Sequence, residues 1–167
     1  MIDLEDELRD EIGVLPPATD LGELIQDADA GRRDRRLRVL LVEDDFASRL
    51  LLQTFLSRYG ECHIAVNGRE AVDAYRSALE RGQSYDLVCM DIMMPEMDGR
   101  EAVRQVRALE EAEGIFSTRG AKIVMTTAVD DFREVVRCFR DLCDAYLTKP
   151  INLSKLLRQM RAWQLIQ

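Results

Sequence analysis

The sequence has none of the usual signs of export or membrane insertion. No apolar run approaches the roughly 18 residues that a membrane helix needs. The N-terminal stretch MIDLEDELRDEIG is acidic and lacks the basic opening and the apolar segment of a secretory signal. We therefore expect a cytoplasmic protein without a membrane partner.

Cysteine and histidine are too few and too scattered for a zinc site. The four cysteines show no C-x-x-C spacing, and the single histidine, His63, is not placed to complete a set of ligands. We interpret the cysteines as buried reduced thiols and His63 as a structural residue in or beside a strand, not as a phosphodonor. The cysteines are Cys62, Cys89, Cys138 and Cys143.

Positive charge is scarce and unevenly placed. The formal net charge is -8; residues 1–30 hold ten acids and one base, whereas GRRDRR at 31–36 contributes four bases and one acid. Residues 37–167 therefore carry a net charge of only -2. No strong basic patch is evident, so we expect no nucleic-acid partner.

These changes in composition divide the chain into an acidic N-terminal extension with a basic junction, 1–36, and one domain, 37–167. In the extension, two apolar series at helical spacing are separated by Pro16-Pro17, and Asp20 with Glu23 resembles a capping box. Two short amphipathic helices and a disordered acidic leader both fit this pattern. The two series are Leu4, Leu8, Ile12 and Leu21, Leu24, Ile25, Ala28.

From residue 37 onward, apolar runs of strand length alternate with helical periodicity. Five repeats of strand then helix predict a doubly wound α/β fold, in which a parallel sheet has helices on both faces. The expected strands are LRVLLV (37–42), CHIAV (62–66), DLVCM (86–90), KIVMT (122–126) and AYLT (145–148).

The helices between these strands have recognisable starts. Asn67 and Asn152 are predicted N-caps, and Asp98 is placed to cap the helix that follows Gly99. The stretch 110–121 is longer than we expect for the end of that helix and its loop, which should alter one surface and leave the site intact. The apolar faces assigned to the first and fourth helices are Ala47, Leu50, Leu51, Thr54 and Phe132, Val135, Val136, Phe139.

Polar residues follow four of the five strands. In a doubly wound sheet the ligand site lies beyond the carboxyl ends of the strands, so these residues should meet at one edge. Two carboxylates about 4 Å apart repel by roughly 4 kcal/mol at an effective dielectric of 20, so a cation must share the site. Lysine supplies one charge, and oxygen ligands favour Mg²⁺. The residues are Glu43, Asp44 and Asp45, then Asp91, Thr127 and Lys149.

The stretch MDIMMPEMDG, 90–99, holds the best candidate for chemistry. Asp91 follows four apolar residues and should project from the end of a central strand, whereas Glu96 and Asp98 lie in the loop beyond. A carboxylate beside a hydroxyl, an ammonium group and Mg²⁺ suits phosphoryl binding and can be the nucleophile that forms an aspartyl phosphate. We therefore predict that Asp91 is the reactive acid.

The motifs VEDD, DLVCMDIMMPEMDG, MTTA and YLTKP, in this order, make the chain resemble a response-regulator receiver domain of two-component signalling over about residues 37–165. The resemblance implies a flavodoxin-like sheet with strand order 2-1-3-4-5. It also implies a switch, not an enzyme, which accepts a phosphoryl group from a histidine kinase or phosphotransfer protein in a phosphorelay or chemotaxis-type pathway.

The resemblance also implies a role for each site residue. Glu43 and Asp44 would hold Mg²⁺ together with Asp91 and the backbone carbonyl of Met93. Asp44 and Asp45 are an alternative acid pair; we prefer the first pair because Arg49 then has the spacing that the family often shows.

The remaining implied roles concern switching. Thr127 would bind the phosphoryl oxygens, and Lys149 would pair with the phosphate. The Lys149-Pro150 bond would be cis. Tyr146 would change rotamer together with Thr127. The downstream target would bind the face formed by the fourth helix, fifth strand and fifth helix.

Two other functions stay open from the sequence. An aspartate-nucleophile phosphatase of the haloacid dehalogenase type would need an acid where Met93 stands, whereas a receiver fold that binds partners irrespective of phosphorylation needs no acid there. Met93 and Val129 also offer no group to orient water, so we expect moderate to slow autodephosphorylation. Because WQLIQ follows the last helix directly, we expect a single-domain regulator without a DNA-binding effector; a homodimer is left open.

Overall fold

The computed structural model describes residues 36–116, 119–128, 133, 136–137 and 142–167. Residues 1–35 of the extension, and Phe132, Val135 and Phe139 of the predicted fourth helix, lie outside the described residues. The described elements are β1 (Leu37–Val42), α3 (Phe46–Leu56), β2 (Gly60–Ala65), α4 (Gly68–Glu80), β3 (Leu87–Asp91), α5 (Gly99–Ala112), β4 (Lys122–Thr127), β5 (Ala145–Thr148) and α7 (Leu153–Ala162).

The five strands form one parallel sheet in the order β2-β1-β3-β4-β5, which confirms the predicted fold. β3 lies in the middle of the sheet and is buried at every position, in keeping with its continuous apolar run. β2 starts at Gly60, two residues before the predicted start, where Gly60 pairs with Leu37. A Cβ at Gly60 would overlap the carbonyl oxygen of Leu37, so only glycine allows the strand to begin there.

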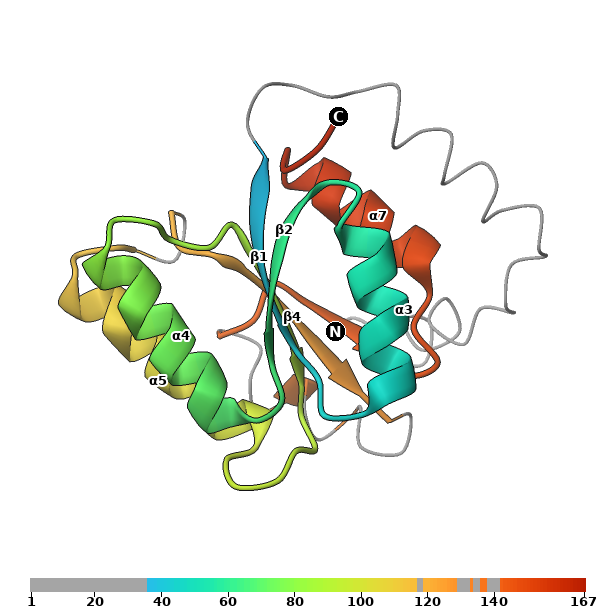
Figure 1. Ribbon diagram of the computed structural model, residues 1–167, viewed down its shortest axis with the longest axis horizontal. Coiled ribbons are helices and arrows are strands. Elements are labelled where there is room, and N and C mark those ends of the chain that lie inside the picture. Colours follow the sequence, from blue (N-terminus) through green and yellow to red (C-terminus); the bar gives the residue numbers. More distant parts are fainter. Residues whose placement is uncertain (1–35, 117–118, 129–132, 134–135, 138–141) are drawn as a thin grey trace.

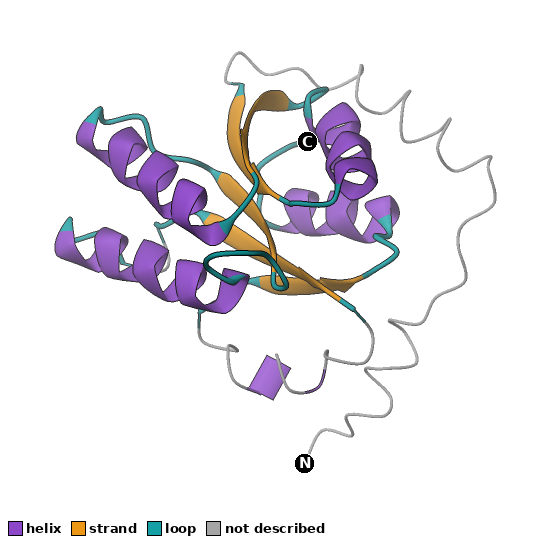
Figure 2. Cartoon of the chain, turned by 60° about the horizontal axis from the view of Figure 1, so that its bottom comes forward, coloured by secondary structure: helices purple, strands orange, loops and turns teal. Residues whose placement is uncertain are grey.

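Helices cover both faces of the sheet (Figure 1). α4 and α5 lie side by side on one face, and α3 and α7 lie on the other; Figure 2 shows the same layers with the sheet between them. Each face therefore buries its own apolar cluster, one built around Tyr75, Met90 and Val106 and the other around Leu52, Leu56 and Leu156. None of the described helices has the length and apolar character of a membrane span.

The predicted apolar face of α3 was wrong. Leu52, Phe55 and Leu56 are the buried residues of this helix, whereas Leu50 and Leu51 are 51% and 45% exposed. The helix has two apolar stripes, and helical periodicity alone does not say which one meets the sheet. The buried stripe is the one that packs against Leu156 and Met160 of α7.

The predicted N-caps are confirmed. The side chain of Asn67 accepts a hydrogen bond from the backbone N–H of Glu70 (2.8 Å), Asn152 accepts one from Lys155 (3.1 Å), and Asp98 accepts one from Glu101 (3.0 Å). These caps satisfy backbone donors that the first helical turn leaves unpaired. They also fix where each loop at the carboxyl edge ends.

The last turns of α5 anchor the opposite edge of the domain. Glu110, 1% exposed, accepts hydrogen bonds from the Tyr75 hydroxyl (2.5 Å) and the Ala121 N–H (2.8 Å), and its other oxygen pairs with Arg107 (2.7 Å). Arg107 continues to Asp144 at 3.0 Å. Glu110 and Ala121, at the two ends of the stretch 110–121, therefore belong to a buried ionic network; the altered surface stays a prediction.

Candidate functional site

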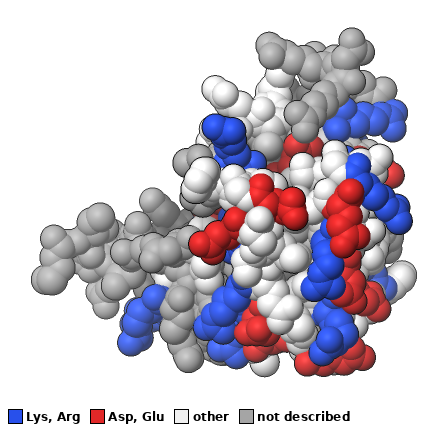
Figure 3. Space-filling view, turned by 90° about the vertical axis from the view of Figure 1, so that its left-hand side faces the viewer, with Lys and Arg blue, Asp and Glu red and all other residues white. Residues whose placement is uncertain are grey.

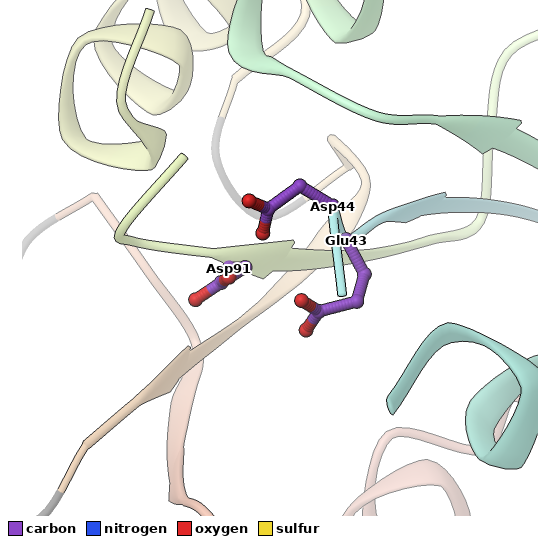
Figure 4. Close-up of side chains that lie close together, drawn as sticks. All are labelled: Glu43, Asp44 and Asp91. Atoms are coloured by element: carbon purple, nitrogen blue, oxygen red, sulfur yellow. The ribbon is translucent and has the colours of Figure 1, made fainter. Parts of the chain in front are cut away.

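The carboxyl edge of the sheet brings three carboxylates together. Glu43 and Asp44 follow β1, and Asp91 ends β3, the strand beside it. One ligand oxygen from each lies within 4.8 Å of the others, and Figure 4 shows the three side chains converging on one space. Glu43 and Asp91 are buried, at 1% and 4% exposure, while Asp44 is exposed, so the cluster is open to solvent on one side.

Lys149 completes the charge arrangement from the end of β5. Its Nζ lies 2.9 Å from Oε2 of Glu43 and 3.2 Å from Oδ2 of Asp91. The backbone N–H of Lys149 donates to the carbonyl of Thr127 (2.8 Å), which ties its loop to the end of β4. The Lys149-Pro150 bond is cis, as predicted.

The protonation of the site follows from this geometry. Burial, and next the charge of Glu43, raise the pKa of Asp91 to about 7, although Lys149 acts in the opposite direction. For Lys149, burial disfavours the charged form, but the ion pairs with Glu43 and Asp91 outweigh it and raise its pKa. Lys149 thus stays charged near neutral pH, and the buried negative charge of Asp91 still calls for a further cation.

Asp45 has a different task from its two neighbours. Its side chain caps α3 by accepting a hydrogen bond from the backbone N–H of Ser48 (2.8 Å), and these Ser48 hydrogen bonds lower its pKa. Its own N–H donates to Oε1 of Glu43 (3.0 Å). Glu43 and Asp44 therefore offer oxygen atoms to the acidic cluster with Asp91, whereas the side chain of Asp45 is the N-cap of α3.

Arg49 supports the acidic turn in a way that sequence reasoning did not identify. Its Nη1 donates to the backbone carbonyls of Glu43 (3.1 Å) and Asp44 (3.3 Å). These bonds hold the turn that presents the two carboxylates. The spacing of Arg49 was noted in the sequence, but only the fold shows that its contacts are with backbone oxygens.

The loop after β3 is held by close backbone contacts. A Cβ at Gly99 would overlap the carbonyl oxygen of Asp91, and one at Gly68 would overlap that of Met97. The N–H groups of Gly99 and Gly68 donate to the carbonyls of Ile92 and Met97, both at 2.9 Å. The close contact at Gly68 was not predicted. A glycine in the first turn of a helix could have indicated it, because glycine is a poor helix former and needs another reason to be there.

The other predicted residues lie on β4 and β5 or in the loop after β3. Thr127 ends β4, is 1% exposed, and donates from Oγ1 to the carbonyl of Ala128 (3.2 Å). Tyr146 is half-buried on β5 beside Met125. The Met93 side chain is 62% exposed, and Glu96 lies in the exposed loop with a positive φ of 65°. Val129 lies outside the described residues.

His63 and the described cysteines have structural surroundings. Nδ1 of His63 lies 2.7 Å from the Tyr85 hydroxyl, and Nε2 lies 3.1 Å from Glu61. Cys62, Cys89 and Cys143 are free, and burial raises the pKa of Cys89 to about 12. Within the described part of the chain, the acidic cluster is therefore the group with the ligands that a hard divalent cation prefers.

Several known sequences are similar to this one. The sequence model of the response regulator receiver domain matches residues 39–161. Sensor protein GacS of Pseudomonas syringae pv. syringae is 38% identical over 130 residues, which cover 77% of this chain and 14% of that protein. Response regulator MprA of Mycolicibacterium vanbaalenii is 37% identical over 127 residues, 75% of this chain and 49% of that protein. The chain thus spans half or less of the length of these relatives.

Solved structures show the same architecture. The Saccharomyces cerevisiae Ssk1 receiver domain, in a co-crystal with the histidine phosphotransfer signaling protein Ypd1, has a TM-score of 0.64 and 30% identity over 79% of this chain and 91% of that one. The receiver domain of the histidine kinase CKI1 from Arabidopsis thaliana, complexed with Mg²⁺ and BeF₃⁻, has a TM-score of 0.62 and 28% identity, covering 83% of this chain and 97% of that one.

Proposed function

Since this chain belongs to the response regulator receiver domain family, we propose that it is a phosphorylation-controlled switch in which Asp91 accepts a phosphoryl group from the histidine of a kinase or phosphotransfer protein. The observation that carries the proposal is the placement of one buried carboxylate, Asp91, 3.2 Å from the ammonium group of Lys149 and within 4.8 Å of ligand oxygens of Glu43 and Asp44. The chain is a receiver domain of two-component signalling, and the proposed step modifies its own Asp91 at the expense of the phosphodonor.

The proposed transfer moves one phosphoryl group between two side chains. A carboxylate oxygen of Asp91 attacks phosphorus, a P–O bond forms, and the P–N bond to the donor histidine breaks with its electron pair left on the imidazole. Lys149 balances negative charge at the reacting oxygens, since its ammonium group already lies beside Asp91. Thr127 would supply a hydroxyl donor to the phosphoryl oxygens from the neighbouring strand.

The donor set fits Mg²⁺. Glu43, Asp44 and Asp91 offer oxygen ligands alone, and the backbone carbonyl of Met93 would complete the protein's share of the coordination. When bound, Mg²⁺ would supply positive charge that offsets the negative charge of the carboxylates and the phosphoryl group. The Mg²⁺ in the similar Arabidopsis receiver structure supports this assignment.

The proposed output is a change in partner binding. A hydrogen bond from Thr127 to the phosphoryl group would free space beside β5, and Tyr146, half-buried on that strand, would turn inward to fill it. The affected face would comprise β5, α7 and the helical segment after β4, most of which lies outside the described residues. A downstream protein that binds this face would then sense the state of Asp91.

Acetyl phosphate with Mg²⁺ tests the proposal directly. We expect the wild-type protein to gain roughly 80 Da, the mass of one phosphoryl group, and the adduct to be labile at alkaline pH. Asp91→Asn should gain no such adduct, whereas the matched control Glu96→Gln, an exposed acid of the same loop, should react like wild type. Equal adducts on wild type and Asp91→Asn, or none on either, would refute the assignment of Asp91.

A further inference from the structure

α3 exposes an apolar stripe to solvent. Phe46, Leu50 and Leu51 are 69%, 51% and 45% exposed, whereas Leu52 and Leu56 of the same helix are buried. Three large exposed apolar side chains within the first two turns of one helix form a surface of the kind that a partner segment covers. The stripe begins directly after the acidic turn, so it borders the functional site.

The same face of the molecule has an excess of basic residues. Residues 46–60 and 150–167, which include α3 and α7, contain five arginines and lysines and no acid. Among the described residues, Arg58, Lys155 and Arg158 form no ion pair with a carboxylate. The cations are Arg49, Arg58, Lys155, Arg158 and Arg161.

The opposite face has no such excess. α4 and α5 together contain five bases and six acids, and ion pairs within each helix join Arg76 to Asp73 and Arg104 to Glu101. Figure 3 shows this face with basic and acidic side chains interleaved. Within the described part of the chain, the face formed by α3 and α7 therefore combines an excess of positive charge with an exposed apolar stripe, whereas the face formed by α4 and α5 has no excess of bases.

The N-terminal extension has the complementary chemistry. Residues 1–30 carry a net charge of -9 and contain two apolar series, of which the second is Leu21, Leu24 and Ile25 with Asp20, Glu23 and Asp27 among them. The domain begins beside α3, since the N–H of Leu37 donates to the carbonyl of Tyr59 just beyond that helix (3.4 Å).

The tether is long enough to reach the stripe. The six residues 31–36 span up to about 20 Å when extended, whereas α3, with 11 residues, is about 16 Å long. A covalent tether of this length gives an effective concentration in the millimolar range, so contacts too weak to hold a separate peptide are sufficient.

We propose that residues 1–30 of this chain bind the α3–α7 face of their own domain, with the second apolar series against Phe46, Leu50 and Leu51 and the acids against Arg58, Lys155 and Arg158. The docked extension would border the acidic cluster.

Zero-length carbodiimide coupling of the full chain tests the docking without phosphorylation. The sequence has only three lysines, Lys122, Lys149 and Lys155, so amide cross-links between lysine and carboxylate are easily assigned by peptide mass spectrometry. We expect links from Lys155 to acids of residues 20–29 in protein of monomer mass. The pair Lys122 and Asp144, 3.2 Å apart, is the internal positive control for coupling.

Matched variants test whether the Lys155 cross-link depends on the α3–α7 face or only on the general reactivity of the lysine. The double variant Leu50→Gln and Leu51→Gln should lower the Lys155 link by roughly threefold or more, because the apolar contact is lost. Phe116→Gln, which changes an apolar residue that is 74% exposed elsewhere, should leave it unchanged. Arg58→Gln with Arg158→Gln should also lower the link, whereas Arg76→Gln with Arg104→Gln on the opposite face should not.

The overturning results are equally specific. Absence of Lys155 links in monomers while Lys122 couples to Asp144 would show that the extension does not dock there. Lys155 links confined to dimers would assign the face to a second copy of the chain. If the yield of the Lys155 cross-link were the same in the Leu50→Gln and Leu51→Gln double variant as in the Phe116→Gln control, α3 would not be part of the contact. Adduct formation with acetyl phosphate, measured on the same proteins, reports on the proposed function separately.

Discussion

The ammonium group of Lys149 lies 3.2 Å from the carboxylate of Asp91, although 57 residues separate them in the chain. The contact joins the end of β5 to the end of β3 across β4, which lies between them in the sheet. Because Lys149 also contacts Glu43 at 2.9 Å, one cation is shared by two buried anions. The site therefore carries excess negative charge unless another cation or a proton is present.

The first prediction concerns stability and pH in the absence of metal. Because the pKa of Asp91 rises from 3.8 to about 7 on folding, the folded state keeps a proton that the unfolded state releases between these values. By linkage, the contribution of Asp91 to the free energy of unfolding falls as pH rises through this interval and levels off above it. Asp91→Asn removes this contribution.

Urea titrations in EDTA measure this effect as the difference between wild type and Asp91→Asn. At about pH 8 we expect Asp91→Asn to be more stable by about 2 kcal/mol, below the roughly 4 kcal/mol that three pKa units represent, because Lys149 loses a partner. The difference should shrink toward about pH 4, below which both states hold the proton. A difference that is constant with pH would contradict the raised pKa.

Lys149 should contribute to stability most when metal is absent. Lys149→Gln leaves two buried carboxylates without their cation; we expect a loss of about 2 kcal/mol near neutral pH, less than for a fully buried pair, because this lysine is 28% exposed. Saturating Mg²⁺ should reduce the loss. Lys155→Gln is the control, and a loss of equal size in that variant would argue against the ionic origin.

Asp44 and Asp45 should differ in their effect on Mg²⁺ affinity. Asp44→Asn removes a charged oxygen ligand and should weaken Mg²⁺ binding by roughly tenfold or more. Asp45→Asn should leave the affinity nearly unchanged, because Asp45 caps α3 and asparagine is also a good N-cap. Calorimetric titration of both variants decides between the two acid pairs; a larger effect for Asp45→Asn would favour the pair Asp44 and Asp45.

The buried network at the opposite edge should affect folding and not phosphorylation. Glu110→Ala leaves Arg107 and the Tyr75 hydroxyl without a shared acceptor, and we expect a loss of about 3 to 5 kcal/mol in the free energy of unfolding. Glu111→Ala, at the exposed neighbouring position, should change it little. The folded fraction of both variants should still be phosphorylated by acetyl phosphate, and loss of the adduct from folded Glu110→Ala would contradict a purely structural role.

The phosphorylated protein should lose its phosphoryl group slowly. The apolar Met93 side chain, two residues after Asp91, is 62% exposed and has no group that can position an attacking water. We expect the adduct on wild type to persist well beyond a few seconds in Mg²⁺, and Met93→Asn to shorten its lifetime. A wild-type half-life of a few seconds, measured by quenched mass spectrometry, would contradict this.

Much of the fold was predictable because local signals were consistent. Continuous apolar runs gave five strands, and Asn67, Asp98 and Asn152 marked helix starts that the structure confirms. The apolar face of α3 was predicted wrongly, because its two stripes have the same periodicity and only packing against α7 selects one. The buried position of Glu110 was also unpredictable, since an acid near the end of a helix normally faces water.

The sequence by itself determined the order of the elements and the chemistry available at each strand end, because apolar periodicity, capping residues and the ordered motifs are local properties of the chain. Tertiary structure decided which of those groups meet. Parallel pairing of β1 with β3, and of β4 with β3 and β5, brings Glu43, Asp91 and Lys149 within contact distance. In the folded chain Asp45 caps α3. Leu50 and Leu51 are exposed to solvent, because the burial of a residue depends on which elements pack together and not on the residue alone.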